Sequence, residues 1–94
     1  MPGGIKFEWD DDNLTHLARH DVSSLEAEQV ILNGFVEIEY QVVDGEEREL
    51  VVGYTNAGRF LTVLWTERSG TVRPITAWDS THEEEEQYWI VKGA

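Results

Sequence analysis

Hydrophobic and polar positions near the start of the chain predict a short strand followed by a short helix. Residues 5–9 alternate between apolar and polar side chains, and this period of two is typical of a strand. Leu14, Leu17 and Ala18 then recur at helical spacing, directly after a run of aspartates that can cap a helix. The pattern predicts a helix over about residues 11–20, with these apolar side chains buried along one stripe.

A tight corner and a second helix are predicted next. Asp21 is expected to end the first helix, because Asp tolerates left-handed backbone geometry better than most residues. Ser23 and Glu26 have the spacing of a capping box, in which each side chain binds the backbone N–H of the other residue. A second helix is therefore expected to begin here and to end at Asn33-Gly34.

After residue 35 the period changes to two, which predicts a series of strands. Turn-forming residues, among them Asp44-Gly45, separate four alternating segments: 36–42, 48–55, 59–66 and 71–78. In the first segment the apolar residues fall on even positions, so one face of that strand should be buried. The third segment is apolar on both faces, which predicts a central place in the sheet. Pro74 has no N–H, so the last strand should lack one hydrogen bond.

The last helix completes the expected fold. Ser80 and Glu83 have capping-box spacing, which predicts a helix that continues to about Val91. The expected order is β-α-α-β-β-β-β-α, an antiparallel meander packed by helices, and the fold class is α+β. No repeat, linker or shift in composition divides the chain. Residues 1–94 are therefore expected to form a single domain with a core over about residues 5–91.

Charge and composition then narrow the classes of function. Nineteen Asp and Glu face seven Lys and Arg, which gives a formal net charge of −12. Such a surface repels phosphate backbones, so it disfavours nucleic acid as the main ligand and fits either a salt-adapted host or a basic protein partner. The chain has no Cys, no apolar run long enough to span a membrane and no signal-peptide pattern. We expect a cytoplasmic protein without membrane contact.

Three side chains of the first predicted helix have the spacing of metal ligands. Asp12, His16 and His20 stand at i, i+4 and i+8, so one helix face can carry all three. The segment lacks the Glu of a metalloprotease motif, and the neighbouring Arg19 would oppose a cation. A solvated face with an Asp–His pair is the favoured interpretation. Neither a metal nor any other cofactor is expected.

The scarce cations are concentrated in the predicted meander. Four of the seven lie at strand ends or just inside strands: Arg48, Arg59, Arg68 and Arg73. Strand ends of adjacent hairpins converge, so these side chains can form a local positive pocket, and the planar guanidinium group binds phosphate through two parallel hydrogen bonds. In the alternative, which we favour for any single Arg, each one pairs only with a nearby acid.

His20 is the main acid–base candidate. An imidazole exchanges protons near neutral pH, and the expected position at a helix C-terminus favours the protonated form. A metal-free ribonuclease needs such a group together with cations that stabilise the charged transition state. The alternative is a His that only orders the corner before Asp21. Trp78, at the end of the last strand, is the candidate for stacking on a base, whereas the other Trp residues are expected to pack.

Several short segments form an ordered set along about residues 5–89. They are Phe7-Glu8-Trp9-Asp10, Leu17-Ala18-Arg19-His20-Asp21-Val22-Ser23, Glu26-Ala27-Glu28-Gln29-Val30, Gly58-Arg59-Phe60-Leu61-Thr62-Val63, Thr66-Glu67-Arg68 and Val72-Arg73-Pro74-Ile75-Thr76-Ala77. This set resembles the BrnT-type toxins of bacterial toxin–antitoxin pairs. No single segment is specific, but the ordered combination is.

The resemblance implies a compact RelE-like fold and a metal-independent endoribonuclease that inhibits translation. It also implies neutralisation by a BrnA-like antitoxin of the ribbon-helix-helix type. By matching position, it assigns functional roles to the His and the four Arg named above. The resulting candidates are His20, Arg48, Arg68 and Arg73 for catalysis, with Arg59 and Trp78 for substrate binding.

Three positions depart from the family pattern. Trp78-Asp79 replaces a frequent basic pair, four Glu at 83–86 stand in a helix that is often Arg-rich, and Asp21 follows the His where Gly is usual. The first two changes remove positive charge from the expected RNA face, which weakens RNA binding. They favour an alternative function, a catalytically weakened module that keeps the antitoxin interface. Whether the arginines gather beside an imidazole distinguishes the two hypotheses.

Overall fold

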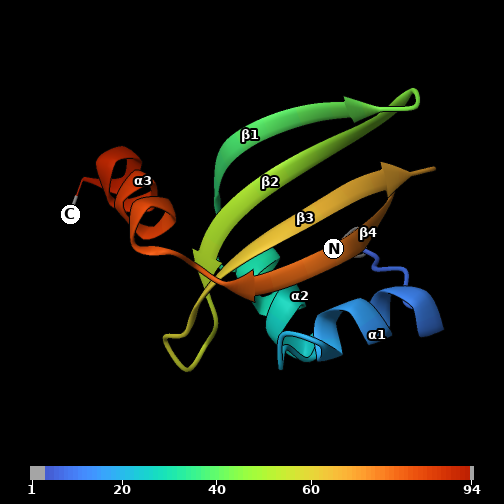
Figure 1. Ribbon diagram of the computed structural model, residues 1–94, viewed down its shortest axis with the longest axis horizontal. Helices are drawn as coiled ribbons and strands as arrows, with labels where there is room; N and C mark the ends of the chain where they lie inside the picture. Colours follow the sequence, from blue (N-terminus) through green and yellow to red (C-terminus); the bar gives the residue numbers. More distant parts are fainter. Residues whose placement is uncertain (1–3, 94) are drawn as a thin grey trace.

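The computed structural model describes residues 4–93, which form three helices and four strands. Their bounds are α1 (Asp11–Ala18), α2 (Ser24–Leu32), β1 (Val36–Val43), β2 (Glu46–Tyr54), β3 (Phe60–Arg68), β4 (Thr71–Asp79) and α3 (His82–Lys92). The strands form one antiparallel sheet in the order β1-β2-β3-β4, so each strand pairs with its neighbours in sequence (Figure 1). The α+β class, the meander and the interior place of β3 are confirmed.

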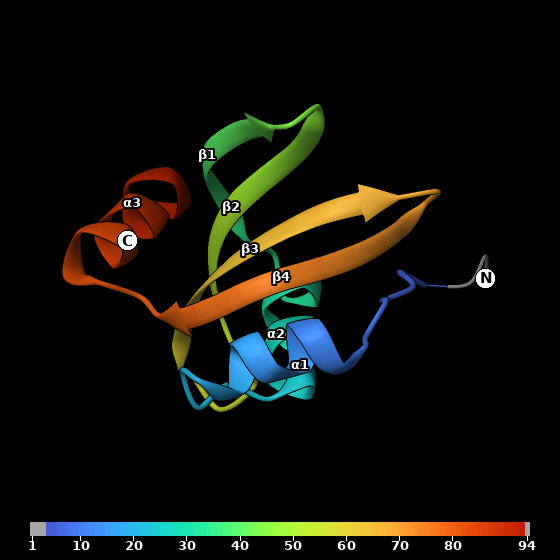
Figure 2. The same ribbon diagram turned by 45° about the vertical axis from the view of Figure 1, so that its right-hand side comes forward.

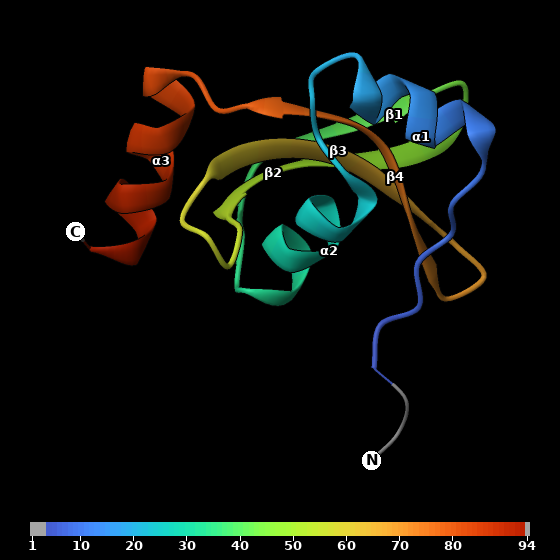
Figure 3. The same cartoon turned by 90° about the horizontal axis from the view of Figure 1, so that it is seen from below.

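The helices pack against different parts of the sheet. α1 packs along β4 and α2 lies across β2 and β3, whereas α3 packs against β1 and β2 (Figures 1 and 2). Viewed from below, α3 stands apart from α1 and α2 (Figure 3). The larger hydrophobic cluster contains Leu17, Val30 and Val51, and the smaller contains Val52 and Tyr88. Adjacent residues of a strand point to opposite faces, so each face of the sheet has its own core.

The expected N-terminal strand is wrong, because the segment forms only one parallel bridge, between Phe7 and Val72 of β4. In a parallel ladder the next N–H would come from position 74, which is Pro. The side chain of Asn13 supplies the missing hydrogen-bond donor at this point. Its Nδ2 donates to the carbonyl oxygens of Glu8 and Pro74, both at 2.9 Å. A buried amide therefore ends the pairing that the alternating pattern predicts.

The first helix is shorter than expected and buries a different face. It ends at Ala18, and Asp21 adopts the expected left-handed conformation with φ of 58°. Its buried residues are Asn13 and Leu17, whereas Leu14 is 40% exposed. The predicted apolar stripe is therefore correct only at Leu17. The polar Asn13 is buried because it satisfies two backbone carbonyls at the sheet edge.

Capping boxes begin all three helices that the structure describes. The predicted box of Ser23 with Glu26 is confirmed. The last box lies one residue later than expected, with Thr81 as the N-cap and Glu84 as its partner. A third box opens α1, where Asp10 and Asn13 exchange side-chain and backbone hydrogen bonds. Because the capping residues themselves adopt extended backbone conformations, each box determines where the preceding chain turns into its helix.

β1 is only partly buried. Val36 is buried as expected, but Tyr40 and Val42 are 53% and 59% exposed. A shift in register between Glu37 and Glu39 interrupts the alternation, and the turn end of the β1–β2 hairpin lies away from α2 and α3 (Figure 1). The expectation of a continuous buried face is therefore wrong for the second half of this strand.

In the described part of the chain, no helix has the length and apolar character needed to cross a bilayer.

Candidate functional site

A pocket of about 270 Å³ lies between α1 and one face of the sheet. Its lining residues are Asp12, Asn13, His16, Glu46, Arg48, Arg68, Arg73 and Ile75. The sheet register explains why three guanidinium groups meet here. Thr66 of β3 pairs with Arg48 on one side and with Arg73 on the other. Directly paired side chains point to the same face, and Arg68, two residues after Thr66, shares that face. Three of the four predicted arginines are therefore brought together.

Glu46 bridges two of these arginines. Its Oε1 accepts a hydrogen bond of 2.9 Å from Nε of Arg48, and its Oε2 accepts one of 3.2 Å from Nη2 of Arg68. The side chain of Arg48 is 28% exposed and that of Arg68 is 54% exposed. The hydrogen bonds from Arg48 and then Arg68 lower the pKa of the Glu46 carboxyl from its ordinary value. A carboxylate thus occupies the space between two cations that face solvent.

Arg73 is the least exposed arginine of the pocket, with 12% of its side chain accessible. It donates two hydrogen bonds to Asp10, from Nη1 to Oδ2 at 2.8 Å and from Nη2 to Oδ1 at 3.2 Å. Glu8 lies 3.7 Å away. The hydrogen bond from Arg73 is the largest cause of a lowered pKa at Asp10 and is followed by the backbone N–H of Asn13. Arg73 is therefore held at the N-terminus of α1 by the residue that caps that helix.

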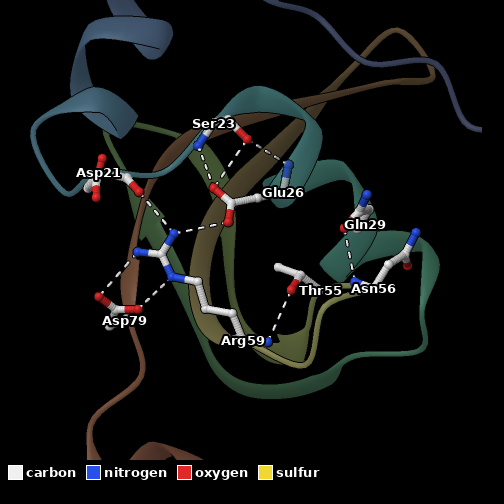
Figure 4. A network of polar contacts seen from close by, with 8 residues as sticks. All are labelled: Asp21, Ser23, Glu26, Gln29, Thr55, Asn56, Arg59 and Asp79. Carbon is white, nitrogen blue, oxygen red and sulfur yellow. Dashed lines mark hydrogen bonds and ion pairs between the residues drawn. The ribbon is translucent and has the colours of Figure 1, made fainter.

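Arg59 lies outside the pocket, in a network that joins the α1–α2 corner to the end of β4 (Figure 4). Its Nε and Nη2 donate to the two carboxylate oxygens of Asp79 at 2.8 and 3.2 Å. Its Nη1 donates to the backbone carbonyl of Asp21 at 2.9 Å and to Glu26 at 3.1 Å. The pKa of Arg59 is raised, first by the hydrogen bond to Asp79. These four bonds use most of its donors, so the geometry is that of a residue that ties segments together.

His20 lies with this second group and not with the pocket arginines. Its ring centroid is 6.3 Å from that of Trp78, with the two planes tilted by 59°. The indole Nε1 of Trp78 donates to Glu84 of α3 at 3.2 Å. Trp78 lies five positions after Arg73 on β4, which is roughly 16 Å along a regular strand. The predicted set is therefore divided between the two ends of β4, with Arg73 at one end and His20, Trp78 and Arg59 at the other.

The imidazole that lines the pocket belongs to His16. From the sequence, His16 is expected to be either a metal ligand with Asp12 and His20 or, as favoured, part of a solvated Asp–His pair. One signal was available: Asp12 and His16 lie one residue before Asn13 and Leu17, so they occupy the neighbouring stripe of the same helix. Because α1 ends at Ala18, His20 does not continue that stripe. No group of three His, Cys, Asp or Glu that can hold a metal ion occurs within residues 4–93.

The fold and the pocket first define a class: a small α+β protein with a pocket on one face of an antiparallel sheet, lined by three guanidinium groups together with acidic side chains. A family model described as ribonuclease toxin, BrnT, of type II toxin-antitoxin system matches residues 9–84. The chain belongs to this family of toxins. Membership in a type II pair implies an antitoxin as partner. No curated protein matched the chain.

Proposed function

We propose that this chain is a metal-independent endoribonuclease that inhibits translation and is neutralised by a cognate antitoxin. The observation that carries the proposal is the gathering of Arg48, Arg68 and Arg73 in one pocket beside an imidazole. Cleavage of RNA through its own 2′-hydroxyl needs no metal when proton transfer and stabilisation of the charged phosphorane come from side chains. Guanidinium groups supply that stabilisation, because they remain charged and match the phosphate oxygens in pairs.

Each side chain then has a distinct proposed role. Arg73, the most shielded of the three, binds the scissile phosphate, and Arg48 with Arg68 binds its other oxygens or the adjacent phosphate. His16 exchanges the proton in the pocket, since imidazole can act as acid and base near neutral pH. His20 and Trp78 bind a flanking nucleotide at the other end of β4, where an aromatic ring can stack on a base.

The two imidazoles can be separated kinetically. The resemblance assigns catalysis to His20, whereas lining of the pocket favours His16. Under the roles proposed here, His16→Ala should lower kcat, and His20→Ala should mainly raise KM. Initial rates of cleavage of a short RNA over a range of RNA concentrations measure both constants. A lower kcat for His20→Ala and a higher KM for His16→Ala would instead assign the acid–base role to His20 and leave His16 without a part in proton transfer.

A simple experiment tests the proposed activity. The chain should be induced without an antitoxin, and the purified protein should be incubated with total RNA at low salt in the presence of EDTA. Low salt matters, because a net charge of −12 repels RNA outside the local pocket. Growth arrest and cleavage are expected. Absence of both, with a correctly folded protein, would reject the ribonuclease.

The proposed partner is an antitoxin of the ribbon-helix-helix type, similar to BrnA, and the proposed compartment is the cytoplasm. The acidic surface supports a basic partner. Exposed apolar side chains of α3 also support a protein contact: Trp89, Ile90 and Val91 are 41%, 79% and 67% exposed. Co-expression with the product of a short neighbouring reading frame should yield a stable complex and relieve growth arrest.

One observation favours a second function, a toxin-like module that binds its antitoxin but cleaves RNA weakly. All four arginines of the meander make ion pairs with carboxylates of the same chain: Arg48, Arg59, Arg68 and Arg73. A paired guanidinium must exchange its carboxylate for phosphate before it can bind RNA. Complex formation without growth arrest or cleavage would select this alternative.

A further inference from the structure

We propose that Glu46 is a built-in competitor for phosphate, whose carboxylate occupies an anion site that RNA must take over. The identity of the natural ligand rests on the proposed ribonuclease function, but the site itself is defined by geometry. The two Glu46 oxygens accept separate hydrogen bonds, one from Arg48 at 2.9 Å and one from Arg68 at 3.2 Å. Two non-bridging oxygens of a phosphate can make the same pair of contacts, since both groups present adjacent anionic oxygens to guanidinium donors.

The position of Glu46 in the sheet places the competitor inside the pocket. It is the first residue of β2, directly after the hairpin turn of Asp44 and Gly45. Arg48 lies two residues later, so both side chains point to the pocket face. The Glu46 side chain is 27% exposed and Arg68 is 54% exposed, so an incoming phosphate can reach the pair from solvent.

Glu46 can leave without disturbing the fold. Its carboxylate makes hydrogen bonds to Arg48 and Arg68 and to no other residue that the structure describes. A partly exposed ion pair of this kind is a weak interaction, and rotation about the side-chain bonds is sufficient to open it. The carboxylate is therefore held only by the two cations that it blocks.

The carboxylate on Arg73 differs in this respect. Asp10 accepts the backbone N–H of Asn13 as the N-cap of α1, in addition to its two bonds with Arg73. Its departure would remove the cap of a helix, whereas the departure of Glu46 removes none. Of the two carboxylates, Glu46 is the displaceable one. Displacement of Glu46 leaves the guanidinium groups of Arg48 and Arg68 free to bind another anion. Only a ligand that binds them more strongly than a carboxylate does can take this place.

The test compares Glu46→Gln with Glu47→Gln. Both variants lose one negative charge, but Glu47 points to the other face of the sheet, where it accepts a hydrogen bond of 2.7 Å from Tyr40. The probe is a short 2′-O-methyl oligonucleotide, which binds like RNA but cannot be cleaved at the methylated ribose. Fluorescence anisotropy should show about tenfold tighter binding for Glu46→Gln than for Glu47→Gln, because charge-assisted bonds to phosphate become available.

The salt dependence provides an independent measure. For single-stranded nucleic acid, the slope of log K against log salt grows by about 0.7 for each phosphate contact that is gained. Glu46→Gln should steepen the slope relative to Glu47→Gln by about this amount, and Glu46→Ala should do the same. Adding Arg48→Ala to Glu46→Gln should abolish the gain. Thermal unfolding of each variant confirms that binding is compared between folded proteins.

Equal binding by the Glu46 and Glu47 variants, whether tighter than or the same as the original chain, would overturn the proposal, because only net charge would then matter. Absence of measurable binding by every variant would overturn it as well. The outcome is separate from that of the ribonuclease test. A Glu46→Gln variant that binds the uncleavable probe more tightly but cuts no RNA would support the competitor and reject the enzyme.

Discussion

Arg59 and the three pocket arginines make the same type of interaction, an ion pair with a carboxylate, but at sites that differ in how they are connected to the rest of the fold. Arg59 and the pocket arginines all form ion pairs with carboxylates. The partners of Arg59 come from the α1–α2 corner, from α2 and from the end of β4, so its bonds join distant segments (Figure 4). Arg48 and Arg68 instead share one carboxylate, that of Glu46, which makes no other side-chain hydrogen bond within residues 4–93. The role of an ion pair can therefore be inferred only when the other hydrogen bonds of both partners are known.

The largest expected effect concerns the pocket. Arg73→Ala should reduce kcat for RNA cleavage by at least about 100-fold, because it removes a preorganised cation from the developing negative charge. The initial rate of cleavage at saturating RNA measures this effect. Circular dichroism and thermal unfolding should show a folded protein. If cleavage persists at the original rate, the pocket is not the site of chemistry.

The second effect concerns stability and sharpens the contrast. Arg59→Ala should lower the free energy of unfolding by about 1–2 kcal/mol, since it removes four largely solvent-exposed hydrogen bonds that join three segments of the chain. For a chain of this size, Tm should fall by about 4–8 °C for each kcal/mol. Cleavage by the folded fraction should change much less than in Arg73→Ala. A large loss of kcat without a loss of Tm would place Arg59 in the catalytic machinery.

The third effect is a pH dependence of the Arg59 network. The pKa of Asp79 is lowered, first by its hydrogen bond to Arg59, and the pKa of Glu26 is lowered by the backbone of Ser23 and by Arg59. Carboxyls with lowered pKa values stabilise the fold above their ordinary pKa and lose this contribution as pH falls through the lowered value. Between about pH 5 and 2, Tm should therefore fall less in Asp79→Asn than in the original chain. Glu47→Gln is the matched control, and equal slopes for Asp79→Asn and the original chain would argue against the network.

The smallest expected effect is on the stability of the pocket. Arg68→Ala should change the free energy of unfolding by less than about 0.5 kcal/mol, because its side chain is 54% exposed and pairs only with Glu46 among the described residues. Chemical denaturation with urea measures it. A loss of unfolding free energy as large as that of Arg59→Ala would show that the pocket arginines also stabilise the fold, and the contrast with Arg59 would not hold.

Local signals predicted most of the fold. The switch from helical spacing to a period of two, the turn at Asp44-Gly45 and the box at Ser23 were correct because each depends on neighbours in sequence. The predicted N-terminal strand is wrong because its pairing is decided by Asn13 of α1 and Pro74 of β4. The predicted burial of Leu14 is also wrong, because Asn13 of the same helix is the residue that faces the sheet edge and Leu14 remains partly exposed.

For the site, the sequence alone determined that the scarce cations lie in the meander and that the chain resembles BrnT toxins, because residue type and order are local properties. Only the tertiary structure decided which cations meet. Register across β2, β3 and β4 joins Arg48 to Arg73, and the end of α1 at Ala18 separates His20 from His16. Contacts between strands depend on how the strands pair in space, and the spacing of residues along the chain does not specify this pairing. Register and helix ends therefore decide which side chains share a pocket.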